Sequence, residues 1–213
     1  MKAIVYDEFG PPDVLKLAEV DPPNPKAHEI LLKVHAASVN PLDWHLIRGE
    51  PAVMRLFGKP KGKIPGADVA GTVEAVGPDV RRFRRGDEVL GTVRGSFAEY
   101  ACGSEDRFAL KPHRVSFEHA ATIPVAGVTA LQALRNYGRL KAGQSVLVNG
   151  ASGGVGTFAV QMAPAFGARV TGVCSARNLE LVRSLGAERV IDYEKDDFTR
   201  QATRYDLILN VAG

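Results

Sequence analysis

The chain has 213 residues, of which 45% are hydrophobic and 24% are charged. These figures exclude a disordered protein and allow one sizeable core or two modest ones. The formal net charge of +3 is too small to indicate a nucleic-acid or membrane-surface binder, so no nucleic-acid partner is expected. No apolar run reaches the ~18 residues of a membrane span, and Asp7 and Glu8 come too early for a signal peptide. We therefore expect a cytoplasmic protein without a membrane span.

The cysteine pattern excludes two common frameworks. Cys102 and Cys174 are far apart, and the sequence has no Cys-x-x-Cys pair. Neither a disulfide framework nor a structural zinc lobe can be built from them, so two inert thiols and no metal are expected.

The composition changes near residue 115, because eleven of the 13 prolines lie at or before Pro112. Up to that point short apolar runs alternate with turn signals such as Gly77-Pro78-Asp79, a pattern typical of an all-β, barrel-like domain. We assign this domain to residues 1–118. Its strands are expected at 3–6, 14–20, 29–39, 69–76, 88–93 and 97–101.

The second part has the pattern of an α/β domain. A helical connector is expected at 119–142, centred on 120–137, and an incomplete doubly wound domain at 143–213. Alternation of apolar strands with helices indicates a parallel sheet. Its strands are expected at 146–148, 169–173, 189–191 and 205–211, with helices beginning near 154 and 178.

A glycine-rich loop lies between the first strand and the first helix of this second part. Glycines allow the chain to turn tightly, to approach a pyrophosphate closely and to pack the helix on the sheet. The helix N-terminus then offers N–H groups and a partial positive charge to the phosphates. The candidate dinucleotide-binding residues here are Gly150, Ser152, Gly153, Gly154, Val155 and Gly156.

The same loop also matches the nucleophile elbow of α/β-hydrolases. In that fold the catalytic histidine follows the serine along the chain, whereas the last histidine here is His119. No triad can form around Ser152 in that order, so its hydroxyl is interpreted as a phosphate contact.

The end of the second strand indicates the cofactor. An NAD site would place an acidic residue there, but Ser175 and Arg177 offer a hydroxyl and a guanidinium to a 2′-phosphate. We predict NADPH in preference to NADH, with Tyr193 in the same cofactor-binding set. The alternative is that Arg177 only begins a surface helix.

The basic run Arg81-Arg82-Phe83-Arg84-Arg85 is the strongest charge cluster in the chain. It is interpreted as a solvated turn rather than as a phosphate-binding patch.

Six segments together resemble the zinc-independent quinone oxidoreductase branch of the medium-chain dehydrogenase/reductase superfamily. The resemblance covers essentially the whole chain and implies a chaperonin-10-like β-barrel domain followed by a Rossmann domain. The segments are residues 1–5, 38–43, 65–71, 86–89 and 127–130 and the glycine loop.

The resemblance also implies a chemistry. Zinc-containing relatives have a cysteine at the position of Asn40 and a histidine at that of Ala67, so a catalytic zinc is not expected. The chemistry that the resemblance then implies is hydride transfer from NADPH to a quinone or an α,β-unsaturated carbonyl. Asn40 and Thr129 would line the nicotinamide side of the site. The alternative is that they merely form hydrogen bonds with backbone groups of the turns beside them.

His45 is the candidate proton donor, since relatives often have a tyrosine in this segment and an imidazole can donate near neutral pH. A packed or solvated histidine is the alternative, with solvent supplying the proton. A second hypothesis for the whole chain is a nucleotide-binding protein with little or no turnover.

Two features depart from the family pattern. Pro164 falls about ten residues into the helix after the glycine loop, where a proline costs ~3 kcal/mol or stops the helix. The sequence ends within the fourth strand of an expected six-stranded sheet. An apolar sheet edge pairs readily with another chain, so a homo-oligomer, or a poorly soluble chain, with weakened NADPH binding is expected.

Overall fold

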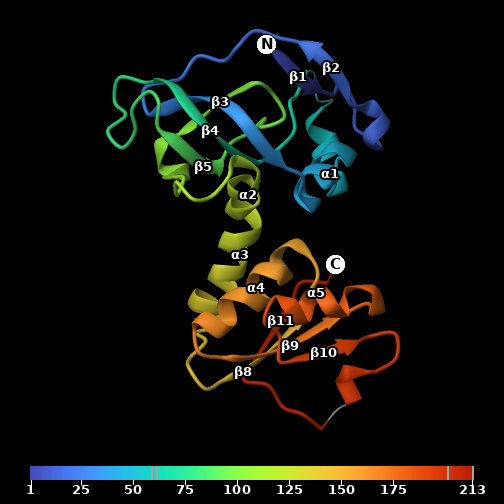
Figure 1. Ribbon diagram of the computed structural model, residues 1–213. Coiled ribbons are helices and arrows are strands. Elements are labelled where there is room, and N and C mark those ends of the chain that lie inside the picture. The colour runs from blue at the N-terminus through green and yellow to red at the C-terminus, as the bar shows by residue number, and fades with distance from the viewer. Residues whose placement is uncertain (59, 61, 201, 213) are drawn as a thin grey trace. The chain divides into compact units, whose positions relative to one another are not determined.

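The computed structural model describes residues 1–58, 60, 62–200 and 202–212. The chain folds into two compact units, Met1–Val125 and Ala126–Gly213 (Figure 1). The expected α/β class, a β domain followed by a Rossmann domain, is confirmed by their sheets.

The first unit is built on a five-stranded antiparallel sheet in the order β6-β3-β4-β5-β7. In its longest strand the buried Ile30 and Leu32 alternate with less buried residues, so one face packs on the core. That core also contains Val69, Val89 and Phe108. The strands are β3 (Glu29–Ser38), β4 (Asp68–Val76), β5 (Glu88–Thr92), β6 (Tyr100–Ser104) and β7 (Phe108–Leu110).

A separate antiparallel pair, β1 (Lys2–Val5) and β2 (Lys16–Glu19), accompanies this sheet. The strand expected at 97–101 is displaced to β6, because the residues just before it are used by β1: Ala98 forms an isolated bridge with Ala3. The short β7 was not expected from the sequence.

Helix α1 (Pro41–Arg48) also was not expected. Pro41 occupies its first turn, where a missing N–H costs nothing. Gly49 ends it in the left-handed region at φ 69°. The remaining helical segments of this unit are η1 (Pro12–Val14), η2 (Ala52–Phe57), η3 (Glu105–Arg107) and α2 (Phe117–Ala121).

A helical run follows α2, as expected for the connector. It consists of η4 (Ile123–Gly127), α3 (Val128–Leu131) and η5 (Gln132–Tyr137), of which η4 and η5 are π-helical. Such π-helical turns are rare and are often found at functional sites. The boundary between the two units lies within η4.

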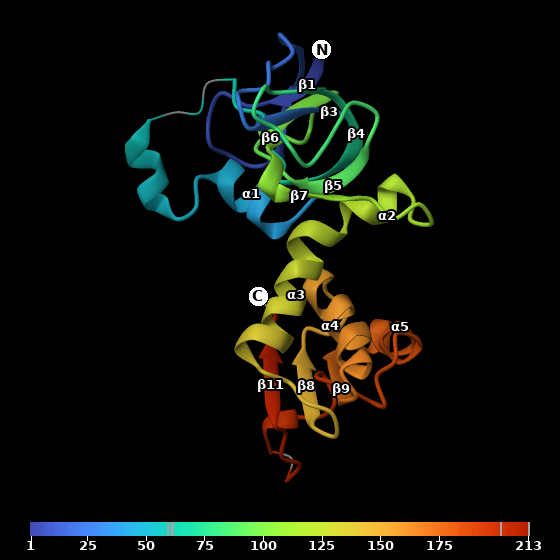
Figure 2. The ribbon, with the colours of Figure 1, turned by 90° about the vertical axis from the view of Figure 1, so that its left-hand side faces the viewer.

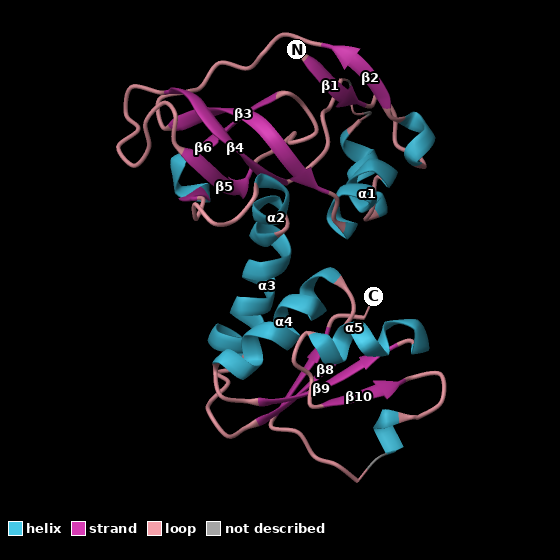
Figure 3. Cartoon of the chain, viewed as in Figure 1, coloured by secondary structure: helices cyan, strands magenta, loops and turns pink. Residues whose placement is uncertain are grey.

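The second unit contains a parallel four-stranded sheet in the order β10-β9-β8-β11. Helices α4 (Gly154–Ala165) and α5 (Leu179–Ser184) pack on one face of it, α4 over β8 and β9 and α5 over β9 and β10 (Figures 2 and 3). The parallel, doubly wound arrangement expected from the sequence is confirmed. The strands are β8 (Ser145–Asn149), β9 (Arg169–Cys174), β10 (Arg189–Asp192) and β11 (Leu207–Asn210), and the short helices are η6 (Ala176–Asn178) and η7 (Phe198–Arg200).

Both faces of this sheet are apolar, as a parallel sheet requires. Val146 and Val148 face the helical side with Leu134, whereas Leu147 faces the opposite side with Val173. Pro164 lies in the last turn of α4, which ends one residue later. Proline therefore marks the end of this helix, as predicted.

None of the helices in the described part of the chain has the length and hydropathy of a membrane span.

Candidate functional site

The glycine loop connects β8 to α4, and two of its glycines are required by the fold itself. Gly150 has a φ of +85°, and a Cβ there would lie 2.8 Å from the backbone nitrogen of Ala212. A Cβ on Gly156 would lie 2.1 Å from the carbonyl oxygen of Gly150. These two glycines therefore let α4 start close against the strand.

Gly153 and Gly154 are different, because the fold restricts them much less. A Cβ on Gly153 or Gly154 would come no nearer than 3.3 or 3.8 Å to its neighbours, and neither residue has a positive φ. Both are exposed. The absence of side chains keeps this surface open to a ligand.

The first turn of α4 faces the same surface. Its N-cap is Gly153, which provides no side-chain hydrogen bond to the first-turn N–H groups. Such groups, together with the helix dipole, form an anion site. Val155 follows in this turn, with its side chain half-buried against the core.

Asn178 connects the glycine loop to the end of β9. Its Nδ2 donates to Ser152 Oγ at 3.1 Å and to Ser175 Oγ at 3.3 Å. The structure thus brings the two predicted phosphate-binding hydroxyls together. Sequence reasoning missed Asn178, since nothing in the glycine motif indicates a bridging amide.

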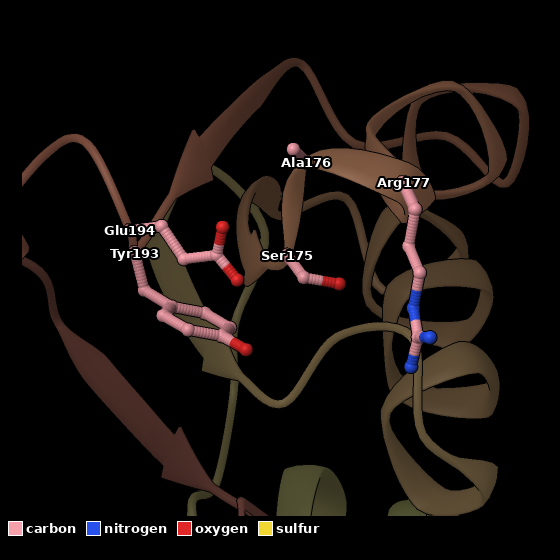
Figure 4. Close-up of a pocket in the computed structure, with 5 residues that line it drawn as sticks. All are labelled: Ser175, Ala176, Arg177, Tyr193 and Glu194. Atoms are coloured by element: carbon pink, nitrogen blue, oxygen red, sulfur yellow. The ribbon is translucent and has the colours of Figure 1, made fainter.

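A pocket of about 390 Å³ lies beside this loop. Figure 4 shows the Ser175 hydroxyl between the Arg177 guanidinium on one side and Tyr193 with Glu194 on the other. Three predicted cofactor residues, Ser175, Arg177 and Tyr193, therefore line one pocket. Glu194 was not predicted, although it directly follows the predicted Tyr193 after β10.

The first unit contains a buried polar network around Asn40. Asp68 Oδ2 accepts from Ser38 Oγ at 2.8 Å and from Asn40 Nδ2 at 3.1 Å, and Asp43 Oδ2 accepts from the Asn40 backbone N–H at 2.7 Å. Burial raises the pKa of Asp68 and of Asp43 above the ordinary carboxyl value. The hydrogen bonds oppose these rises because they favour the ionised forms.

His45 lies on α1 and is paired with an acid that the sequence analysis did not include. Its Nδ1 lies 2.6 Å from Glu50 Oε2, and its ring stacks on Trp44 at 3.7 Å between centroids. A carboxylate on Nδ1 fixes the ring orientation and leaves Nε2 as the nitrogen for proton transfer.

The remaining predicted residue, Thr129, lies on α3 in the second unit, where it is exposed. Asn40 and His45 belong to the first unit.

The basic run at 81–85 forms hydrogen bonds and an ion pair with acidic residues of its own unit. Glu105 Oε2 accepts from the backbone N–H groups of Arg81 and Arg82, and Arg85 pairs with Glu74 at 2.6 Å. These contacts confirm the interpretation as a turn.

Both cysteines are free thiols. Burial raises the pKa of Cys102 to about 11, with Glu29 adding to the rise. Burial also raises the pKa of Cys174, and Asp192 contributes.

Among the described residues, no three His, Cys, Asp or Glu side chains are grouped so as to hold a metal ion.

Comparison with known proteins places this geometry in a family. Residues 26–114 match the alcohol dehydrogenase GroES-like domain, and residues 154–213 match the zinc-binding dehydrogenase domain. The chain is 40% identical to the chloroplastic quinone-oxidoreductase homolog of Spinacia oleracea, over 100% of the chain and 68% of that relative.

The chain belongs to the quinone oxidoreductase family of the medium-chain dehydrogenase/reductase superfamily.

Two further members support the assignment. The quinone oxidoreductase from Coxiella burnetii superposes with a TM-score of 0.92 at 39% identity, covering 100% of this chain and 69% of that one. The chloroplastic NADPH-dependent alkenal/one oxidoreductase of Arabidopsis thaliana is 38% identical, over 100% of this chain and 58% of its own length. The chain thus spans roughly two thirds of the length of these family members.

Proposed function

We propose that the chain is an NADPH-dependent reductase that transfers hydride to a quinone or an α,β-unsaturated carbonyl. The observation that carries this proposal is the surface at the start of α4. Gly154 leaves it open although the fold would accept a side chain there, and Asn178 connects the loop to Ser175 of the neighbouring pocket. A pyrophosphate with a neighbouring phosphomonoester fits this combination of groups.

The choice of NADPH rests on Arg177 and Ser175. A guanidinium and a hydroxyl suit a 2′-phosphate, whereas ribose hydroxyls are usually met by an acid. Glu194 in the same pocket reduces this preference without removing it, since its exposed charge is screened by solvent. The Arabidopsis relative is named as NADPH-dependent.

When bound, the cofactor supplies the hydride. The protein then has to hold phosphates and nicotinamide, orient the acceptor and provide a proton. We assign the phosphates to the glycine loop, the nicotinamide half to Asn40 and Thr129, and the proton to His45 Nε2.

We also propose that no metal takes part. Support comes from Asn40 and Ala67, which stand where zinc-containing relatives have a cysteine and a histidine, and neither side chain is a ligand that zinc prefers. Elemental analysis of the purified chain and assays with and without a chelator test this point. Loss of activity on chelation, restored by Zn²⁺, would contradict it.

The reductase assay follows NADPH oxidation with a panel of quinones and enones under controlled oxygen. Cofactor binding is measured separately by fluorescence titration. Binding with turnover supports the proposal, whereas binding without turnover on any acceptor indicates the second hypothesis, a nucleotide-binding protein. Absence of NADPH binding contradicts both.

Two expectations from the sequence stay predictions. One is the cytoplasmic location, since the spinach and Arabidopsis relatives are both named as chloroplastic. The other is the homo-oligomer, which light scattering at micromolar concentration tests directly.

A further inference from the structure

Asp68 is a fully buried carboxylate at the start of β4, and three donors converge on it. Oδ2 accepts from Ser38 Oγ at 2.8 Å and from Asn40 Nδ2 at 3.1 Å. Oδ1 accepts from the backbone N–H of Val125 at 2.9 Å. These bonds satisfy an ionised carboxylate that is otherwise costly to bury.

The same contacts determine which way the Asn40 amide faces. An amide group is nearly symmetric in shape, so its orientation is set by its partners. Nδ2 of Asn40 donates to Asp68 and also to Ser38 Oγ, at 3.3 Å. The Ser38 hydroxyl hydrogen is already directed to Asp68, so Ser38 Oγ meets Asn40 as an acceptor.

We propose that Asp68 is the positioning residue for Asn40, holding the nitrogen side of its amide toward β4 and so fixing the orientation in which this side chain meets a ligand. This inference rests on the proposed function, because the ligand concerned is the cofactor or the acceptor. The backbone N–H of Asp43 in the first turn of α1 also reaches the Asn40 side chain, so the amide is held from the helix as well as from β4.

The distances account for one N–H of Asn40. Ser38 Oγ and Asp68 Oδ2 lie 2.8 Å from each other and 3.3 and 3.1 Å from Nδ2, so a single N–H is directed at both. Loss of the Asp68 acceptor would leave the amide free to rotate.

A purely structural role for Asp68 would act through Val125 alone. The two roles separate in Asp68→Asn, because the new side-chain oxygen still accepts from Val125 N–H while its amide nitrogen turns toward Asn40. The Asn40 amide then has to reverse to offer Oδ1 to that nitrogen. Ser38→Ala is the matched control, since it removes one Asn40 contact and leaves both Asp68 oxygens in place.

Nitrogen-15 NMR of the full chain tests the orientation without any cofactor. The Asn40 side-chain signals are assigned by their loss in Asn40→Ala. In the wild type we expect the amide hydrogen directed at Asp68 to exchange at least about tenfold more slowly than those of the exposed Asn24. In Asp68→Asn this protection is lost while the Val125 backbone amide stays protected, and Ser38→Ala loses part of it.

Kinetics with NADPH and a quinone give the functional readout. Asp68→Asn should raise the KM for NADPH or lower kcat about tenfold, more than Ser38→Ala does. Fast exchange of the Asn40 amide in the wild type would overturn the proposal even if Asp68→Asn does not fold. Unchanged Asn40 protection in a folded Asp68→Asn would also overturn it. Failure of NADPH to bind a wild type with a protected Asn40 amide would instead overturn the proposed function.

Discussion

Arg177 and Glu194 place opposite charges in the pocket that we assign to the 2′-phosphate. Replacement of Arg177 by Ala removes the only cation that lines this pocket in the described part of the chain. A hydrogen bond to a charged group contributes about 1.5–3 kcal/mol, which corresponds to a roughly ten- to hundredfold loss of NADPH affinity. NADH affinity should change little.

Fluorescence titration of both cofactors measures this difference. Arg183→Ala is the matched control, because Arg183 pairs with Glu180 on the exposed side of α5. If wild-type protein binds NADH as tightly as NADPH, the assignment of Arg177 is wrong.

The role of His45 can be separated from that of its partner. His45→Phe keeps a flat ring beside Trp44 but removes the proton donor, so the rate with an enone should fall by about 10²-fold or more. An unchanged rate and pH profile would assign the proton to solvent.

Glu50→Gln provides the intermediate case. It retains a hydrogen-bond acceptor for His45 Nδ1 without the negative charge. If Glu50 acts only by orienting the ring, the rate of this variant with an enone should stay close to that of the wild type. A fall toward the rate of His45→Phe would show that the charge of Glu50 is needed.

Residue identities alone revealed part of the site. Gly150, Gly153, Gly154 and Gly156 could be predicted because a strand–glycine–helix pattern is local in sequence. Asp68, Asn178 and Glu194 could not, because their partners are distant along the chain: Asp68 meets Val125, and Asn178 meets Ser152. A single sequence gives no signal for such contacts.

The secondary-structure elements, too, could be predicted where their signal is local in sequence. The strands of the second unit were predicted to within a few residues because apolar residues run through each of them, and β8 and β9 are buried along most of their length. Helix α1 was missed, because it is only eight residues long and begins with the proline that usually indicates a turn. Strand β6 was displaced because residues 97–99 bond to the N-terminal strand instead.

The glycine loop gives a prediction at the scale of one element. Gly156→Ala should destabilise the chain strongly, because its Cβ would meet a backbone oxygen that cannot move away. Gly154→Ala should leave stability unchanged or improve it by up to about 1 kcal/mol, since alanine is the better helix former. Its methyl group would nevertheless occupy the surface assigned to the pyrophosphate.

Thermal unfolding and NADPH titration together check this pair. We expect a normal Tm with at least about tenfold weaker binding for Gly154→Ala, and a lowered Tm for Gly156→Ala. Full NADPH affinity in Gly154→Ala would remove the glycine loop from the proposed site.

Asp206 connects the start of β8 to the segment before β11. Its carboxylate accepts from the backbone N–H and the hydroxyl of Ser145, each at 2.8 Å, and these bonds lower its pKa. A lowered folded-state pKa stabilises the protein above the ordinary carboxyl range and is lost as the pH falls through the folded value. Asp206→Asn should therefore lower Tm at neutral pH.

The difference in Tm between wild type and Asp206→Asn should shrink as the solution is acidified. Asp197→Asn, an exposed acid that pairs with Arg200 in the same unit, serves as comparison. A gap that stays constant down to strongly acidic pH would show that the charge of Asp206 does not contribute.

At the scale of the whole molecule, the chain has a separate core in each unit. Leu134 is fully buried in the core of the second unit and Leu32 in that of the first. Truncation of either to alanine should cost about 2–5 kcal/mol. Because the two cores share no residue among those described, the damage should stay within one unit.

Hydrogen exchange followed by mass spectrometry shows which of the two units is destabilised in each variant. Leu134→Ala should accelerate exchange across 126–212 and Leu32→Ala across 1–125. Equal acceleration across both units in either variant would show that the chain unfolds as one cooperative body.

The state of the two thiols has a consequence for a protein that handles electrophiles. Quinones and enones add covalently to thiolates, and they therefore inactivate many proteins that meet them. With a pKa of about 11, Cys102 is a thiolate in only about one molecule in ten thousand at neutral pH. Cys174 is buried, and its pKa is also raised. Under the proposed function, the burial of Cys174 in its core and the raised pKa of Cys102 both reduce addition of the chain's own acceptors to its thiols.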